Sequence, residues 1–261
     1  MTEAETFIAA IIAQPDDDTV RLVYADWLAE NGQPDRGEFV RAEIELAQSL
    51  LNEEIDERRR RVLLDRRAAL LKRHKAVWLA PFLPFAKESS FERGFVHAVE
   101  VPALDFLQRG EKWFTLTPLT RVKITELHTW VPTEGRVSCG PELFASPLLS
   151  RVTSLDLSGL ELTAGDLEPL AAHPDLSRLR ELVLTYNGLR SDGATLLAGM
   201  PQLAHLESLD LRSNGITDPG ARAVALGAHF GTMKELRISK NSIRNRTWAL
   251  LEERFGPALV G

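Results

Sequence analysis

Cysteine is almost absent from this chain, and tyrosine and methionine are scarce. Among 261 residues there is one cysteine, Cys139, so no disulfide can form within the chain. A single thiol is typical of a reducing compartment, and we expect a cytoplasmic protein. The first residues lack the basic segment that precedes the apolar part of a signal peptide, and no apolar run reaches 18 residues. We therefore expect neither a signal peptide nor a membrane span.

Positive charge is also in deficit. Lysine and arginine number 31 against 37 acidic residues, which gives a net charge of −6. A general nucleic-acid-binding protein would carry a basic excess. The one basic cluster extends from Arg58 to Lys75, and its cationic members are Arg58, Arg59, Arg60, Arg61, Arg66, Arg67, Lys72, Arg73 and Lys75.

The acids interleaved with this cluster decide how it is interpreted. They are Glu53, Glu54, Asp56, Glu57 and Asp65, and at helical spacing they would pair with the arginines. This pattern favours a solvated helix face. The alternative is a nucleic-acid-associated factor that binds through Arg58–Lys75.

Recognisable catalytic motifs are missing. The sequence contains no G-x-S-x-G, no phosphate-binding G-x-x-x-x-G-K, no G-x-G-x-x-G and no H-E-x-x-H. The six histidines have no metal-ligand spacing, so we expect no metal, no cofactor and no enzymatic activity. A cryptic enzyme built around Cys139, in a glycine-flanked loop, is the less favoured alternative.

What the chain does have is a repeat with a period of 27 residues. The copy that starts at Leu179 fits L-x-x-L-x-L-x-x-N-x-L at every position. The copy at Leu206 differs only in Ile216 at the last position, and a third starts at Met233 with conservative changes. A degenerate first copy starts at Val152 and carries Leu160 in place of the asparagine. We interpret Asn187, Asn214 and Asn241 as structural residues that hydrogen-bond the backbone of a neighbouring turn. That ladder should be missing at the degenerate copy.

These stretches resemble leucine-rich repeats, and the period is similar to that of the ribonuclease-inhibitor subclass. The resemblance implies an α/β fold, a short solenoid with parallel strands on the concave side and helices on the convex side. Helices are expected at 164–172, 192–199 and 218–228, with N-caps at Thr163, Ser191 and Thr217, and a last helix at 245–255 should cover the core. Segments 96–104 and 119–127 are expected to be irregular early repeats, with a strand at 95–101, and 129–140 a loop insertion.

The solenoid resemblance also implies protein binding, and the outward-facing strand residues supply the candidates. Arginine and tyrosine dominate binding hot spots. The partner-binding candidates are Asp156, Arg180, Tyr186, Asp210, Arg212 and Arg237. The alternative is a solvated sheet with cross-strand charge pairing, because Arg180, Glu207 and Lys234 alternate in sign along one column.

The first part of the chain predicts helices. An apolar stripe from Val20 to Leu28 has helical spacing, Gly32 suits a helix end, and the acids Asp16–Asp18 suit a helix start. The order R-L-V-Y-A-D-W-L from Arg21, followed by N-G-x-P-x-R-x-E-F from Asn31, resembles the bacterial repeat-companion domain. That family implies no activity. On this helical hairpin, Asp26 is expected to pair with Arg36 or Arg41.

Together these patterns predict a helical domain at 1–50, a charged helical connector at 51–90 and a repeat domain at 91–261, with regular repeats from 152. The predicted function is that of a non-enzymatic protein-interaction or scaffold module. We expect an unknown protein partner and a monomer or weak oligomer.

Overall fold

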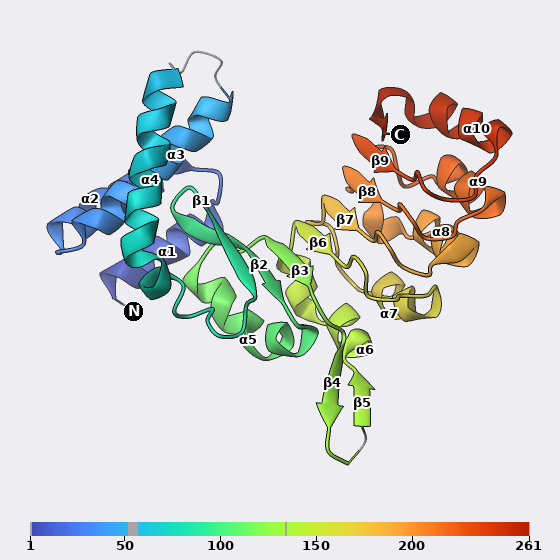
Figure 1. Ribbon diagram of the computed structural model, residues 1–261, viewed down its shortest axis with the longest axis horizontal. Coiled ribbons are helices and arrows are strands. Elements are labelled where there is room, and N and C mark those ends of the chain that lie inside the picture. The colour runs from blue at the N-terminus through green and yellow to red at the C-terminus, as the bar shows by residue number, and fades with distance from the viewer. Residues whose placement is uncertain (1, 52–56, 134, 261) are drawn as a thin grey trace. The chain divides into compact units, whose positions relative to one another are not determined.

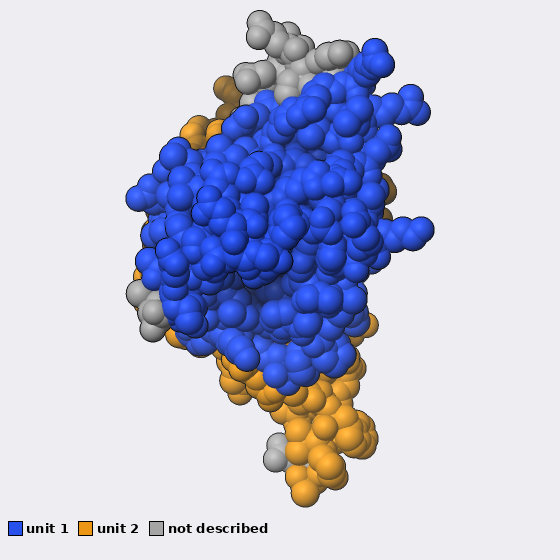
Figure 2. Space-filling model, turned by 90° about the vertical axis from the view of Figure 1, so that its left-hand side faces the viewer, with its two compact units in different colours: residues 1–99, 109–119 blue, residues 100–108, 120–261 orange. Residues whose placement is uncertain are grey.

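The chain is divided into two compact units, as the computed structural model shows (Figure 2). The structure describes residues 2–51, 57–133 and 135–260. The first unit comprises residues Met1–Val99 and Arg109–Leu119, and the second comprises Glu100–Gln108 and Thr120–Gly261. Within the described residues, none of the helices has both the length and the apolar character needed to cross a membrane.

The first unit begins with four helices, α1 (Glu3–Ala13), α2 (Asp18–Glu30), α3 (Pro34–Leu51) and α4 (Glu57–Trp78). Asp17 caps α2 by accepting a hydrogen bond from the Thr19 N–H at 2.8 Å, which confirms the helix-start interpretation for this acid. Tyr24 and Leu28 of the predicted stripe are buried, whereas Val23 is about half exposed. The stripe is therefore narrower than expected, and only its Tyr24–Leu28 side enters the core.

Two glycines set close backbone approaches in this unit. A Cβ atom on Gly37 would lie 2.3 Å from the Ala25 carbonyl oxygen, so only glycine lets α3 cross α2 this closely. Gly94 has a φ of +85°, and a Cβ there would lie 2.7 Å from the Cα of Val40. Gly94 belongs to the turn between β1 (Glu88–Glu92) and β2 (Phe95–Val101), and β2 coincides with the predicted strand.

The second unit is built on a parallel sheet whose strands lie side by side with helices behind them (Figure 1). The strand order is β3 (Arg121–Ile124), β6 (Ser154–Asp156), β7 (Glu181–Val183), β8 (Ser208–Asp210), β9 (Glu235–Arg237) and β10 (Leu259–Val260). The register from β6 to β9 advances by the repeat period, so that Leu155, Leu182, Leu209 and Leu236 are successive partners. This is the mixed α/β, solenoid-like arrangement predicted from the sequence.

The helices of this unit alternate with the strands. They are α6 (Gly140–Phe144), α7 (Glu168–Ala171), α8 (Arg190–Ala198), α9 (Asp218–Leu226) and α10 (Asn245–Phe255), and α5 (Ala103–Leu116) is shared between the two units. Short 3-10 turns lie at Pro147–Arg151, Gly165–Leu167, Pro201–Leu203 and Gly256–Ala258. Small residues let α8 and α9 pack closely, since a Cβ on Gly220 would lie 2.7 Å from the Cα of Ser191.

The segment at 119–127 also enters the sheet. Strand β3 pairs in parallel with β6, with Val122 beside Leu155, which is the 33-residue spacing expected for an irregular early repeat. Val122 and Ile124 are both buried.

The asparagines form the expected ladder. Asn187 Oδ1 accepts hydrogen bonds from the backbone N–H groups of Leu160 and Leu162, both at 3.0 Å, and its Nδ2 donates to the Leu157 carbonyl oxygen at 2.9 Å. Asn241 Oδ1 accepts hydrogen bonds from the backbone N–H groups of Asn214 and Ile216 in the same way. Asn187 thus still bonds the backbone of the degenerate copy. What is missing is the set of hydrogen bonds that an asparagine side chain at position 160 would make.

The side-chain bonds expected of the predicted N-caps are not formed, although Thr217 does occupy the N-cap position of α9. Thr217 precedes α9 but its side chain caps nothing, and Ser191 lies inside α8. Their hydroxyls bond each other across the repeat at 2.8 Å, and Ser191 Oγ accepts from the Thr217 N–H. Thr163 donates its N–H and its hydroxyl to Asp166. Cross-repeat bonding therefore satisfies the hydroxyls of Ser191 and Thr217, whereas Thr163 bonds Asp166 locally.

The loop expected at 129–140 is also wrong. Residues His128–Val131 and Gly135–Ser138 form the antiparallel strands β4 and β5, which pair only with each other among the described strands. The turn residues Pro132 and Gly135 suggested a loop, but the run of Thr129, Trp130 and Val131 before the turn was a strand signal.

Candidate functional site

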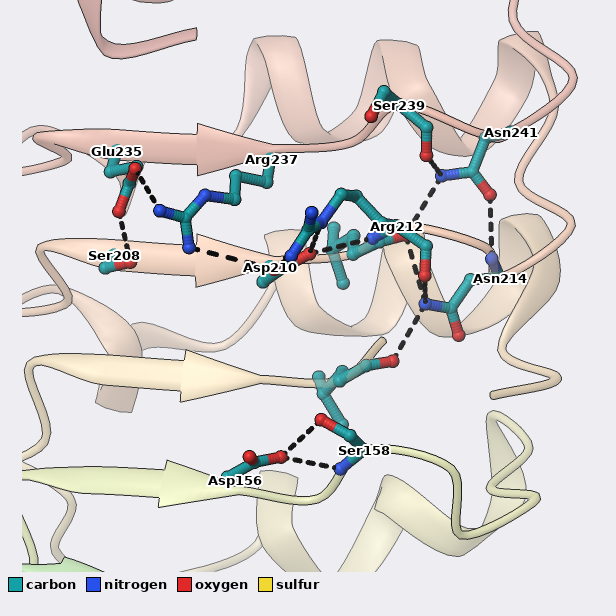
Figure 3. A network of polar contacts seen from close by, with 12 residues as sticks. Asp156, Ser158, Ser208, Asp210, Arg212, Asn214, Glu235, Arg237, Ser239 and Asn241 are labelled. Carbon is teal, nitrogen blue, oxygen red and sulfur yellow. Dashed lines mark hydrogen bonds and ion pairs between the residues drawn. The ribbon is translucent and has the colours of Figure 1, made fainter. Parts of the chain in front are cut away.

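The strand face of the second unit carries a compact charge network (Figure 3). Asp210 on β8 is almost completely buried, and both of its carboxylate oxygens accept from Arg212, with Nε at 3.0 Å from each and Nη2 at 2.6 Å from Oδ2. Arg237 on β9 approaches the same carboxylate at 3.9 Å and donates to Glu235 at 2.6 Å. A buried carboxylate needs such partners, and it fixes both guanidinium groups in return.

The neighbouring column of this face is also paired. Glu181 accepts from Arg121 at 2.6 Å and from the Ser154 hydroxyl at 2.8 Å. Glu235 accepts from the Ser208 hydroxyl at 3.4 Å in the equivalent place two strands on. Many of the charged side chains on this surface are therefore engaged in cross-strand ion pairs and hydrogen bonds.

The column of alternating sign has the predicted contacts. Glu207 lies 2.7 Å from Lys234 and 4.0 Å from Arg180, and the lysine lowers the pKa of the Glu207 carboxyl. Arg180 also donates to the carbonyl oxygens of Ser177 and Leu179. The geometry of charge pairing is thus confirmed.

The six candidate residues do not form one cluster. Asp210, Arg212 and Arg237 are brought together, whereas Asp156 bonds its own turn through the Ser158 N–H at 2.8 Å. Val183 stands between Asp156 and Asp210 in the sheet register, and Arg180 belongs to the separate Glu207 column.

Tyr186 is the exposed aromatic residue beside this network. Its side chain is 65% exposed, and its N–H donates to the Arg212 carbonyl oxygen at 3.1 Å. Its φ is +56°, and the equivalent positions Gly159, Ser213 and Lys240 are left-handed as well. Every repeat therefore turns off its strand at this position, whatever the residue, and in this copy the turn presents an aromatic ring to solvent.

Four arginines of the basic helix α4 bond carboxylates of α3, which are partners that spacing within one helix did not suggest. Arg59 bonds Glu45 at 2.6 Å, Arg73 bonds Asp35 at 3.2 Å, and Arg66 and Arg67 bond Glu38 and Glu43, all on α3. The expected pairing along the helix is found between Arg60 and Glu57 at 3.9 Å, and Glu53, Glu54 and Asp56 lie outside the described residues. For these four arginines α3 supplies the carboxylate partners, because α3 and α4 pack side by side.

Cys139 lacks the environment of a nucleophile. The thiol is buried, and its pKa is raised, first by burial and then by Glu142 and Glu126. Reactive cysteines have a lowered pKa and a nearby cation. Within the described chain, histidine, cysteine and acidic residues form no group of three that could hold a metal ion.

Arg36 was one of the two partners expected for Asp26, and the structure places it at the centre of the first unit instead. The guanidinium of Arg36 lies over the rings of Trp78, Phe39, Phe95 and Phe91, and its Nη2 donates to the Gly94 carbonyl oxygen at 2.6 Å. Its burial lowers its pKa to about 10. Asp26 pairs with Arg41, and not with Arg36. Sequence reasoning missed the cage because its rings come from separate segments.

A search of curated proteins finds no match to the chain. The sequence profile of the family described as Leucine Rich repeat matches residues 177–198 and 202–225. Those segments contain the copies that start at Leu179 and Leu206, with strands β7 and β8 and helices α8 and α9. Residues 177–225 are therefore two leucine-rich repeats, a unit that commonly serves in protein–protein interaction.

Proposed function

We propose that this protein is a non-enzymatic interaction module that binds another protein through the strand face of its leucine-rich repeats. The observation that carries the proposal is the exposed Tyr186 beside Arg212, whose carbonyl oxygen accepts the Tyr186 N–H just beyond the ends of the neighbouring strands β7 and β8. Tyrosine and arginine are the residue types that supply most binding energy in interfaces.

The geometry gives this pair a further advantage. Arg212 is held by two oxygens of the buried Asp210, and the Tyr186 backbone is held by the Arg212 carbonyl group. Side chains that are ordered before binding lose less conformational entropy when the complex forms. Arg237 extends the same rigid patch, whereas Asp156 and Arg180 would lie at its margin.

The basic helix offers less support for a nucleic-acid-associated function. Four of its arginines bond carboxylates of α3, so binding phosphate there would require these ion pairs to break. We keep the cytoplasmic location, the ribonuclease-inhibitor subclass and the bacterial repeat-companion assignment of the N-terminal helices as parts of the proposal.

The test is quantitative affinity purification of the tagged protein from its own cells, with Tyr186→Ala as the first variant. Its side chain makes no hydrogen bond with the described residues, so its loss leaves the Asp210 network intact. Leu226→Ala is the matched control, because Leu226 is 70% exposed on α9 behind the sheet. Partners retained by the control and depleted at least about tenfold by Tyr186→Ala, a loss of about 1.4 kcal/mol in binding, support the proposal.

Charge reversal at Arg212 or Arg237 is a poor substitute for this test. A glutamate at either position would face the buried Asp210 carboxylate and destabilise the fold. A partner set that Tyr186→Ala and Arg212→Lys both leave unchanged contradicts binding through this surface.

A further inference from the structure

The β4–β5 hairpin is a two-stranded sheet that stands apart from the parallel sheet of its own unit. Four residue pairs join its strands, from His128–Ser138 to Val131–Gly135. Figure 1 shows the hairpin extending away from the strands and helices of the repeats that follow it. A two-stranded sheet alone is only marginally stable in water, and a third strand stabilises it.

The outer edge of β4 lacks most of the usual protection, since only its short length and Pro132, which follows it, guard it. Proteins guard exposed edges with charged side chains, prolines or bulges. The strand reads His-Thr-Trp-Val, a sequence with high β-propensity and no acid, lysine, arginine or proline. Among the described strands, β5 alone pairs with β4.

The same strand carries the most exposed large hydrophobic side chain of the described residues. Trp130 is 75% exposed and lies opposite Arg136 in the hairpin register. Arg136 Nη2 lies 3.2 Å from His128 Nδ1, so the cation of β5 is directed toward a neighbour within the hairpin. β4 therefore carries no acid, lysine or arginine, and the arginine of the hairpin lies on β5.

We propose that β4 pairs with β4 of a second copy of this chain, in an antiparallel arrangement across a two-fold axis near Trp130. The resulting sheet has the order β5-β4-β4-β5. A strand that pairs with its own copy meets the same residues on the other side, so a charged strand repels itself, whereas β4 does not. Cross-strand tryptophans near the axis add an aromatic contact to the backbone hydrogen bonds.

The size of the contact predicts a weak dimer. Four residues from each copy bury less than the standard interface area, and such interfaces are transient. We expect a dissociation constant between about 1 µM and about 1 mM.

The test is sedimentation equilibrium of the full chain from about 5 to about 500 µM, a span that covers most of that range. The expected result is an average mass that rises toward twice that of one chain. Trp130→Lys places like charges beside each other at the axis and should weaken association at least about tenfold. Thr133→Lys is the matched control, because it adds the same charge in the turn beyond β4 and should leave the dimer unchanged.

Hydrogen exchange identifies the surface that pairs. Protection of the amides at 128–131 that increases with protein concentration supports the proposal. A chain that stays monomeric at the highest concentration overturns it, and so does a dimer that gains no protection there. Partner depletion by Trp130→Lys from a monomeric chain would instead assign the edge to a strand of another protein. The dimer does not depend on the proposed strand-face function, since Tyr186→Ala should leave it unchanged.

Discussion

The guanidinium of Arg36 lies 4.6 Å from the centre of the Trp78 ring and links α3 to the end of α4. Lysine cannot reproduce this contact, because it lacks the planar group that stacks on the ring and reaches the Gly94 carbonyl group at the same time. We expect Arg36→Lys to lower the free energy of unfolding by about 2 kcal/mol, from the lost cation–π contact and charged hydrogen bond.

Urea unfolding followed by tryptophan fluorescence measures this change. Arg61→Lys is the control, because Arg61 is exposed on α4 and its substitution should change stability by less than about 0.5 kcal/mol. Equal effects from the two variants would contradict the cage as a stabilising contact.

The parts of this molecule that could be predicted are those fixed by local periodicity. The 27-residue period predicted strands β6 to β9 and the buried leucines that lie between each strand and its helix. It could do so because each repeat buries the same positions. The asparagine ladder followed from the same period. The hydroxyl N-caps failed because Ser191 and Thr217 have a better partner in the next repeat, which no single repeat reveals.

The ion pairs of the first unit show the opposite case. The partners of the α4 arginines lie 14 to 38 residues away on α3, and the rings around Arg36 come from α3, α4 and the β1–β2 hairpin. Sequence spacing predicts contacts within one helix but gives no information on how two helices are aligned. Gly37 and Gly94 are a similar case, because each is required by a close approach of two backbones that one segment of sequence does not reveal.

The asparagine ladder predicts unequal effects of similar substitutions. Asn187 Oδ1 accepts two N–H groups, whereas Asn214 Oδ1 has no hydrogen-bond partner among the described residues and only its Nδ2 is bonded. Orphaned buried N–H groups are rarer and more costly than orphaned carbonyls. We expect Asn187→Ala to cost about 3 kcal/mol in unfolding free energy and Asn214→Ala about 1.5 kcal/mol.

Chemical denaturation of both variants gives this comparison, with Asn245→Ala at an exposed position as a control. An equal loss at the two ladder positions would mean that the accepted N–H groups do not determine the stability of the turn.

The Asp218 carboxylate predicts a pH dependence of stability. It accepts from the Arg244 N–H at 2.9 Å, and that bond is the main cause of its lowered pKa. A lowered carboxyl pKa stabilises the fold above the unfolded value of about 4, and this contribution is lost as the pH falls through the folded value. Asp218→Asn should therefore destabilise the protein at pH 7 and progressively less toward pH 3. A difference between wild type and variant that is constant with pH would contradict this origin.

Cys139 should behave as an inert thiol. Because burial and nearby acids raise its pKa, the thiolate fraction at pH 8 is small. We expect modification by iodoacetamide to be at least about tenfold slower in the folded chain than in urea. Rapid modification of the folded chain would restore the alternative of a cysteine-based enzyme.

At position 186, fold stability and partner binding should favour different residues. A non-glycine residue in the left-handed region costs about 1 kcal/mol, and Gly159 occupies the same position in the first repeat without that cost. We expect Tyr186→Gly to raise the free energy of unfolding by up to about 1 kcal/mol while it weakens partner binding, because the exposed ring is lost. Ser213→Gly, at the equivalent position with φ +57°, should give a similar gain in stability without the loss of binding. Denaturation and affinity purification of the two variants separate these effects. If Tyr186→Gly instead destabilises the chain, the ring packs on the repeat and does not serve as a free contact for a partner.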